Sequence, residues 1–216
     1  MNALVEKILD SPNLPEIVDE LQARLAAERA RRERFYVEIA EDQKAEFING
    51  QVILHSPATV RHLEIRDNLQ QLLRPYVQLK NLGWVTGEKG LCVFPRNDYE
   101  PDVCFFRSEK SAGLQPDQLK LPIPDFIAEV LSKSTERHDR REKFQDYAAH
   151  GVQEYWIIDP NEEILEQYLR KDAGYELALK SGTGDVRSAA VAGFCLPVRA
   201  LFDPRLNLEV LRAMLA

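Results

Sequence analysis

Two carboxylates interrupt apolar segments in the middle of the chain, where an ionised side chain is costly to bury. Glu129 lies within DFIAEVL (residues 125–131), whose apolar run is typical of a strand that is buried on both faces. In such a strand the carboxylate needs a cation or a hydrogen-bond donor. The pattern is also compatible with an edge strand whose Glu129 faces water, and with a buried ion pair.

Asp102 stands directly before a second apolar run, VCFF (residues 103–106). Strand alternation places Asp102, Cys104 and Phe106 on one face. If this segment pairs with residues 125–131, Asp102 and Glu129 lie across from each other, and facing carboxylates repel unless a divalent cation lies between them. Mg²⁺, with Mn²⁺ as the alternative, suits such a pair because it binds one or two carboxylates and leaves positions for water and phosphate oxygens.

Hydrolysis at such a site also needs a cation near the attacking water, where negative charge develops. Lys143 is the best candidate, because it follows the Glu129 segment in a predicted helix, beside Phe144 and Tyr147 on the apolar face of that helix. The alternative is a surface lysine in a highly charged helix.

The elements that must position these residues follow from periodicity and turn signals. A hairpin is expected over residues 45–54 around Asn49-Gly50. Helices are expected over residues 59–80, 136–150 and 206–215. Strands are expected over residues 84–94, 99–106, 125–131, 155–158, 164–169 and 191–198. The order predicts an α/β fold in which helices flank a mixed sheet.

A separate helix is expected at the N-terminus. Asn13, Pro15 and Glu16 mark its start, and apolar residues continue at helical spacing into an arginine-rich stretch. We expect residues 1–34 to form a helical extension that packs on the core or on a second subunit, and residues 35–216 to form the main domain.

Composition narrows the class of protein. The hydrophobic fraction of 44% and the charged fraction of 29% are those of an ordinary globular protein. The net charge of −7 counts against a protein that simply coats nucleic acid, but it does not exclude a nuclease. Three cysteines without CxxC spacing indicate ordinary buried thiols. With neither a membrane-length apolar segment nor a signal-peptide pattern, the chain is expected to be cytoplasmic and independent of membranes.

Two long segments, YEPDVCFF and PDFIAEVLSKSTERHDRREKFQDYAAHGVQEYWIIDP, resemble the Uma-type restriction-endonuclease family of bacteria, part of the PD-(D/E)XK nuclease superfamily. The resemblance extends over about residues 35–205. It implies a restriction-endonuclease-like αβββαβ core, with Asp102 and Glu129 as the catalytic, metal-binding acids. The superfamily lysine is expected two residues after the second acid, where this chain has Leu131, so the resemblance assigns the catalytic lysine to Lys143 in the next helix, with Lys133 as the competitor.

Two more positions match the family and are candidates for a supporting role. Glu46 corresponds to an acidic position at the start of the family domain and could reach the metal or its water. His62 lies on the first core helix, where a partly buried histidine without a metal is the simpler interpretation.

The resulting hypothesis is an Mg²⁺- or Mn²⁺-dependent endonuclease that hydrolyses phosphodiester bonds of nucleic acid, with DNA as the expected substrate and a homodimer expected by analogy. The alternatives are a catalytically inactive nuclease-fold module for dimerisation or nucleic-acid binding, and a metal-dependent hydrolase of another phosphate or ester. The arginine-rich stretch and residues 133–141 could contact the DNA backbone, but the sequence does not assign the nucleic-acid-binding residues.

Overall fold

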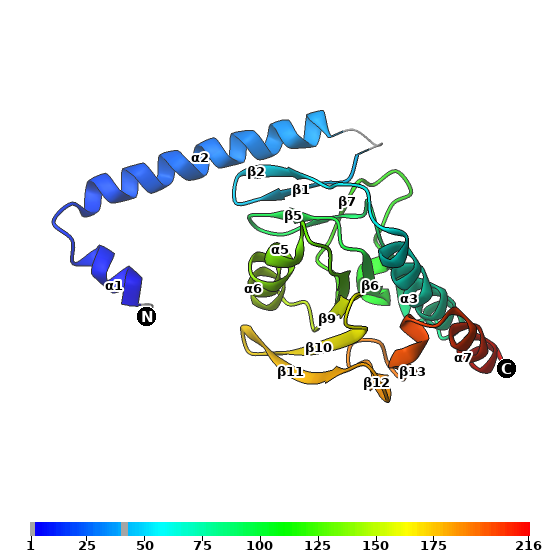
Figure 1. The fold of residues 1–216 in the computed structure, drawn as a ribbon. Helices are drawn as coiled ribbons and strands as arrows, with labels where there is room; N and C mark the ends of the chain where they lie inside the picture. The colour runs from blue at the N-terminus through cyan, green and yellow to red at the C-terminus, as the bar shows by residue number, and fades with distance from the viewer. Residues whose placement is uncertain (1–2, 40–42) are drawn as a thin grey trace.

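The computed structural model describes residues 3–39 and 43–216, and a six-stranded mixed sheet forms its centre (Figure 1). The strand order is β11-β10-β9-β8-β6-β3. Its strands are β3 (Gly83–Thr86), β6 (Val103–Arg107), β8 (Phe126–Val130), β9 (Glu154–Asp159), β10 (Ile164–Lys171) and β11 (Gly174–Ser181). β8 and β9 are parallel, and the other pairs are antiparallel.

Helices cover both faces of this sheet. On one face α3 (Val60–Leu79) packs its Leu69, Leu72 and Leu73 against sheet residues that include Val103 and Phe105. The 3-10 helix η1 (Val198–Leu201) and α7 (Pro204–Leu215) lie beside α3. On the other face are α5 (Glu136–Arg140) and α6 (Glu142–Ala149). The sequence α3, β3, β6, β8, α5–α6, β9 is the expected αβββαβ core, which is thereby confirmed.

A second sheet lies against this core and has the order β2-β1-β5-β4-β7. Its strands are β1 (Ala45–Ile48), β2 (Gln51–Leu54), β4 (Leu91–Val93), β5 (Asp98–Tyr99) and β7 (Lys120–Leu121). Asn49 and Gly50 form the β1–β2 turn, with φ of 51° and 80°, as the hairpin signal predicts. The remaining elements are α4 (Ser108–Ser111) and a two-stranded sheet of β12 (Asp185–Arg187) and β13 (Cys195–Pro197).

Four predicted elements are wrong in their extent. Residues 84–94 are not one strand but two, β3 and β4, which belong to different sheets. Residues 99–106 divide into β5 and β6 around Pro101, which lacks the N–H that a continuous ladder needs. Residues 136–150 divide into α5 and α6 at Arg141, whose φ of −127° and ψ of −83° are not helical. Only residues 195–197 of the segment 191–198 form a strand.

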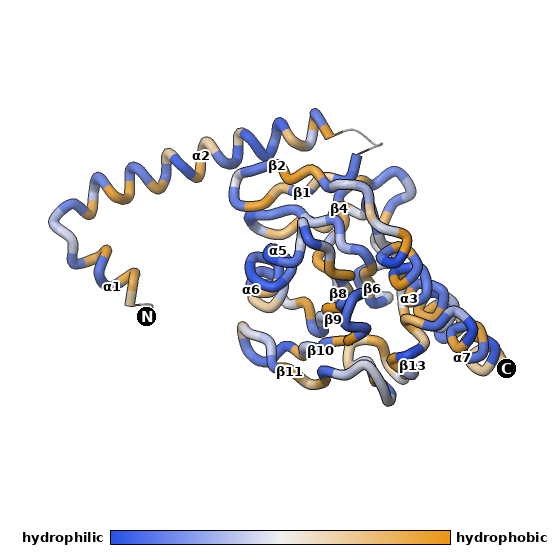
Figure 2. The backbone as a smooth tube through the Cα atoms, viewed as in Figure 1, coloured by the Kyte–Doolittle hydropathy of each residue, from blue (hydrophilic) through white to orange (hydrophobic). Residues whose placement is uncertain are grey.

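The N-terminus forms two helices, α1 (Ala3–Leu9) and α2 (Leu14–Glu38), and α2 has Pro15 in its first turn as predicted. The second half of α2 packs on the β1–β2 hairpin and the first half projects beyond the body of the molecule (Figures 1 and 2). The boundary expected at residue 34 lies inside α2, and the division into two domains remains a prediction. None of the described helices is long and apolar enough to cross a membrane. The three cysteines are free thiols, and Cys92 and Cys104 are buried as expected, whereas Cys195 is only partly buried.

Candidate metal and catalytic site

Asp102 and Glu129 lie side by side where β6 and β8 pair. Val103 pairs with Ala128, so the same antiparallel register places Asp102 opposite Glu129. The Asp102 N–H donates to Glu129 Oε2 at 3.2 Å, and the Val130 N–H donates to Asp102 Oδ2 at 3.0 Å. Both residues are buried, with exposed fractions of 4% and 3%. The strand pairing on which the sequence argument depended is therefore present, and neither acid is on an edge strand facing water.

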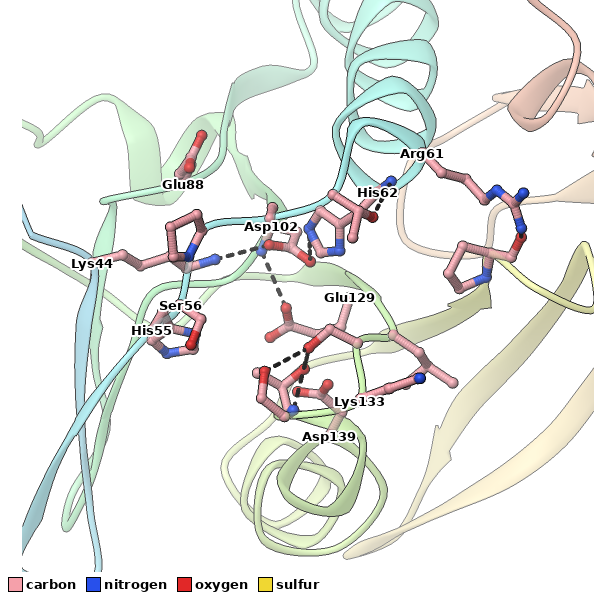
Figure 3. Close-up of a pocket in the computed structure, with 18 of the residues that line it drawn as sticks. Lys44, His55, Ser56, Arg61, His62, Glu88, Asp102, Glu129, Lys133 and Asp139 are labelled. Carbon is pink, nitrogen blue, oxygen red and sulfur yellow. Dashed lines mark hydrogen bonds and ion pairs between the residues drawn. The ribbon is translucent and has the colours of Figure 1, made fainter.

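Two basic side chains contact the Asp102 carboxylate. Lys44 Nζ lies 2.8 Å from Asp102 Oδ1, and His62 Nε2 lies 3.3 Å from Asp102 Oδ2. Lys44 comes from the segment before β1, and His62 from the first turn of α3. Figure 3 shows both side chains directed at the Asp102 carboxylate, His62 from α3 and Lys44 from the opposite side. His62 is partly exposed, and its ring contacts Asp102, one of the two expected metal ligands.

Lys143 is the centre of a buried group of carboxylates. Its Nζ lies 2.9 Å from Glu129 Oε1, 2.9 Å from Glu46 Oε1 and 3.2 Å from Asp139 Oδ1. The Tyr147 hydroxyl, one turn further along α6, donates to the same Glu129 oxygen at 3.0 Å. The Lys143 side chain is only 2% exposed, so the interpretation as a surface lysine is wrong.

The other candidates occupy different places around these residues. Glu46 lies behind Lys143 and pairs with His55, whose Nε2 is 3.1 Å from Glu46 Oε2. Burial acts to raise the pKa of Glu46, but Lys143 and His55 outweigh it and lower the pKa to about 2. Lys133 is exposed on the wall of the cleft, away from Glu129, whereas Lys143 contacts that carboxylate directly.

The two central carboxyls have opposite pKa shifts. Burial acts to raise the pKa of Asp102, but Lys44 and His62 outweigh it and hold the pKa well below its usual range. Burial raises the pKa of Glu129 to about 8, with the surrounding carboxylates acting in the same direction and Lys143 against it. Lys143 itself stays protonated, because its carboxylate neighbours outweigh burial and raise its pKa well above the usual value. Glu129 is thus the acid whose surroundings carry too little positive charge to stabilise its ionised form.

The charged groups of the site include more carboxyls than lysines. The ionisable groups in direct contact are the buried carboxyls of Glu46, Asp102, Glu129 and Asp139, the buried ammonium group of Lys143 and the partly buried one of Lys44. If His55 and His62 are left aside and all four carboxyls are ionised, these groups carry a formal charge of −2. The raised pKa of Glu129 means that this carboxyl reduces the excess by keeping a proton, and a divalent cation could take the place of that proton. Among the described residues no group of three or more His, Cys, Asp or Glu is arranged to hold a metal ion. A cation at Asp102 and Glu129 would therefore rely on water and phosphate oxygens for its remaining ligands, as Mg²⁺ commonly does.

These residues lie at the base of an open cleft of about 1090 Å³ (Figure 3). One wall is formed by residues 54–62, which lead from β2 into α3, and another by residues 131–135 after β8. The walls include the basic and hydroxyl side chains of Ser56, Thr59, Arg61, Lys89, Ser132, Lys133, Ser134 and Thr135. The cleft thus has buried carboxylates at its floor and walls that are rich in hydrogen-bond donors.

Sequence reasoning missed two members of the site. Lys44 precedes a short strand and has no periodicity to mark it, so only its contact with Asp102 identifies it. Asp139 lies in STERHDRREK, whose composition is that of a solvated helix, although its spacing of four residues from Lys143 was a usable signal. Gly87 also supports the site, because a Cβ there would lie 2.0 Å from the Asp102 carbonyl oxygen.

Comparisons with known proteins show the family and the fold of the chain. The model of the Uma2 family, described as a putative restriction endonuclease, matches residues 32–199. An uncharacterized protein of Synechocystis sp. is 31% identical over 128 residues, which cover 58% of this chain and 72% of that protein. The crystal structure of a putative nuclease belonging to DUF820 from Anabaena variabilis superposes with a TM-score of 0.66 and 19% sequence identity. That superposition covers 82% of this chain and 96% of the other, and it shows a shared fold.

Proposed function

Because the chain belongs to the Uma2 family of restriction endonucleases, we propose that it is a metal-dependent endonuclease that hydrolyses phosphodiester bonds in DNA. The observation that supports this proposal most directly is the adjacent pair Asp102 and Glu129, with Lys143 2.9 Å from Glu129, at the base of an open cleft. Carboxylates can hold the metal ion for phosphodiester hydrolysis, and a lysine beside them can stabilise the charge that develops.

Asp102 and Glu129 are the proposed ligands of Mg²⁺ or Mn²⁺. Their adjacent carboxylate oxygens are the donors that such an ion prefers, and the raised pKa of Glu129 indicates that this acid lacks sufficient positive charge around it. When bound, a divalent ion of this kind polarises a phosphoryl oxygen and lowers the pKa of a bound water.

The protein's own groups supply the rest of the reaction. Lys143 keeps Glu129 oriented and supplies positive charge next to the attacking water, and Tyr147 fixes the same carboxylate oxygen through its hydroxyl. Glu46 acts in support by fixing Lys143 from behind. Arg61 and Lys133 line the cleft walls, and their positive charges would attract the phosphates of a bound nucleic acid.

The test is plasmid cleavage by purified protein with Mg²⁺ or Mn²⁺. Asp102→Asn keeps an oxygen that can accept the Val130 N–H but removes the charge that holds the metal. We expect cleavage to fall by at least about 100-fold, since an electrostatic contribution at such a centre is typically 10²–10³ in rate. The matched control is Asp185→Asn, an exposed carboxylate on β12, which should cleave like the wild type.

Cleavage that survives Asp102→Asn in a protein of unchanged circular dichroism would contradict the proposal. So would the absence of cleavage with both metals under conditions in which the chain is folded.

The second candidate is a catalytically inactive nuclease-fold module for dimerisation or nucleic-acid binding. Two observations favour it: Leu131 replaces the strand lysine, and Lys44 and Lys143 already pair with the two acids without a metal. Calorimetric titration with Mn²⁺ separates the candidates. An inactive module binds DNA without regard to Mn²⁺ or Asp102, whereas the nuclease binds Mn²⁺ and loses this binding in Asp102→Asn.

We also infer that the active form is a homodimer, because two active sites can cut both strands of a duplex in a single binding event. The expectation of a cytoplasmic protein remains a prediction.

A further inference from the structure

Helix α2 carries one stripe of residues whose spacing alternates between four and three positions. The stripe consists of Leu14, Val18, Leu21, Leu25, Glu28, Arg32 and Phe35. This spacing keeps all seven side chains on one face and is the pattern of the seam between two paired helices. The helix is 25 residues long, roughly 37 Å at the usual rise per residue.

The two halves of the stripe have different surroundings. In the second half, Phe35 is 3% exposed, and Arg32 donates to Asp98 in an ion pair of 2.6 Å. In the first half, Val18, Leu21 and Leu25 are 38%, 47% and 45% exposed. The apolar half is therefore a direct continuation of the α2 surface that packs on the body, and it extends beyond the body's edge (Figure 2).

A projecting helix of this kind needs a partner. Helices of about a dozen residues are marginal in water, and most helical stability in proteins comes from packing of the apolar face. Within the part of the chain that the structure describes, α1 contacts α2 but leaves Val18, Leu21 and Leu25 exposed.

The charge of this half limits the kind of partner. Residues 14–25 contain Glu16, Asp19 and Glu20 against Arg24, a formal charge of −2. Nucleic acid and anionic membranes are disfavoured by this charge, because both attract basic surfaces.

We propose that the seam residues Val18, Leu21 and Leu25 pair antiparallel with the same residues of a second copy of this chain. The twofold axis passes between Leu21 and Gln22, so Val18 lies level with the partner's Leu25, and Leu21 packs against the partner's Leu21 within one residue of the axis. Such an interface is self-complementary, as a symmetric dimer requires.

Two flanking charges fit this arrangement. Glu20 and Arg24 lie on one side of the stripe and form an exposed pair of 2.6 Å within the helix, with side chains 63% and 75% exposed. In the antiparallel arrangement Glu20 lies level with the partner's Arg24, and Arg24 with the partner's Glu20. The opposite charges therefore meet twice across the axis.

Sedimentation equilibrium of the full chain tests the proposal. We expect the wild type to have twice the chain mass of 24.8 kDa at micromolar concentration, and Leu21→Glu/Leu25→Glu to have the monomer mass. The control is Val37→Glu, which changes an apolar side chain of the same helix that is 86% exposed and outside the stripe, and this variant should remain a dimer. A monomeric wild type, or a dimer that survives the double substitution, overturns the proposal.

A mixing experiment tests the antiparallel arrangement itself. Glu20→Lys alone places two like charges across the axis, and so does Arg24→Glu alone, so each variant should dimerise about tenfold more weakly than the wild type. Mixed one to one, the two variants restore opposite charges at both positions and should form a heterodimer of near wild-type affinity. If the mixture associates no better than its components, the proposed arrangement is wrong. None of these variants touches Asp102 or Glu129, so the result is independent of nuclease activity.

Discussion

At the scale of single residues, the two lysines of the site have different surroundings. Lys143 contacts three carboxylates at the base of the cleft, with 2% of its side chain exposed. Lys44 contacts the Asp102 carboxylate and is 18% exposed at the cleft surface. A cation that binds Asp102 must therefore displace Lys44 or share the carboxylate with it, whereas Lys143 can stay in place.

This difference leads to a prediction about metal affinity. Lys44→Met keeps the length of the side chain and removes the competing charge, so the Kd of the protein for Mn²⁺ should fall on the order of tenfold, which corresponds to about 1.4 kcal/mol. Isothermal titration calorimetry measures the change without reference to activity. Lys133→Met, at an exposed lysine of the same cleft, is the control and should leave the Kd unchanged. Weaker Mn²⁺ binding in Lys44→Met would show that Lys44 supports the metal instead of competing with it.

The residues that the sequence could identify were those that violate a pattern. Asp102 and Glu129 stand in apolar strands, so their cost of burial was visible without coordinates. Lys143 could be ranked above Lys133 only through the family resemblance and the apolar neighbours of Lys143. Lys44 violates no local pattern, since its partner Asp102 is 58 positions away in the sequence.

At the scale of elements, α5 is attached to the sheet by one carboxylate of β10. Glu166 accepts hydrogen bonds from Arg140 at 2.9 Å and from the Tyr168 hydroxyl at 2.7 Å, and it pairs with Lys180 of β11 at 2.9 Å. Burial acts to raise the pKa of Glu166, but these partners outweigh it and lower the pKa to about 2. Because Arg140 belongs to the helix just before Lys143, this contact helps to hold the lysine-bearing segment on the sheet.

The lowered pKa predicts how stability depends on pH. A carboxyl whose folded pKa is below its unfolded value of about 4.5 stabilises the fold fully above pH 4.5 and loses that contribution as the pH falls towards 2. Glu166→Gln should therefore lower the free energy of unfolding at pH 7 by roughly 1–2 kcal/mol, allowing for solvent screening of its partners, and by much less near pH 2.

Urea unfolding at pH 7, 4 and 2.5 measures this dependence. Glu176→Gln, which removes the exposed pair with Lys171, is the control and should change the free energy of unfolding by less than about 0.5 kcal/mol at every pH. An equal loss for Glu166→Gln at all three pH values would mean that packing, not charge, accounts for its contribution.

The elements also show where prediction from sequence reached its limit. β6 and β8 have five residues each and clear apolar patterns, so both their existence and their pairing were predictable. β4, β5 and β7 have two or three residues, too few for any periodicity. β3 and β4 follow each other closely along the chain and are joined through Gly87. The sequence therefore predicted them as one long strand, although they belong to two different sheets. Asp102 lies at the point where the chain passes from the second sheet to the first. For the same reason, the sequence did not predict this position.

At the scale of the whole molecule, the proposed dimer and the proposed nuclease site make a joint prediction. Antiparallel pairing of α2 relates two clefts by a twofold axis, and the two strands of a DNA duplex are related by such axes as well. A dimer can therefore present one site to each strand, whereas a monomer has one site and must release the duplex or rebind it to cut the second strand.

Leu21→Glu/Leu25→Glu should consequently change the products of plasmid cleavage more than its rate. We expect the wild type to convert supercoiled plasmid to linear DNA with little nicked intermediate, and the double variant to accumulate nicked circles that become linear slowly. Gel electrophoresis of time courses with Mn²⁺ separates the three forms, and Val37→Glu should give the wild-type pattern. Linear product formed without nicked intermediate by a variant that sedimentation shows to be monomeric would mean that the two strands are not cut by two copies paired through α2.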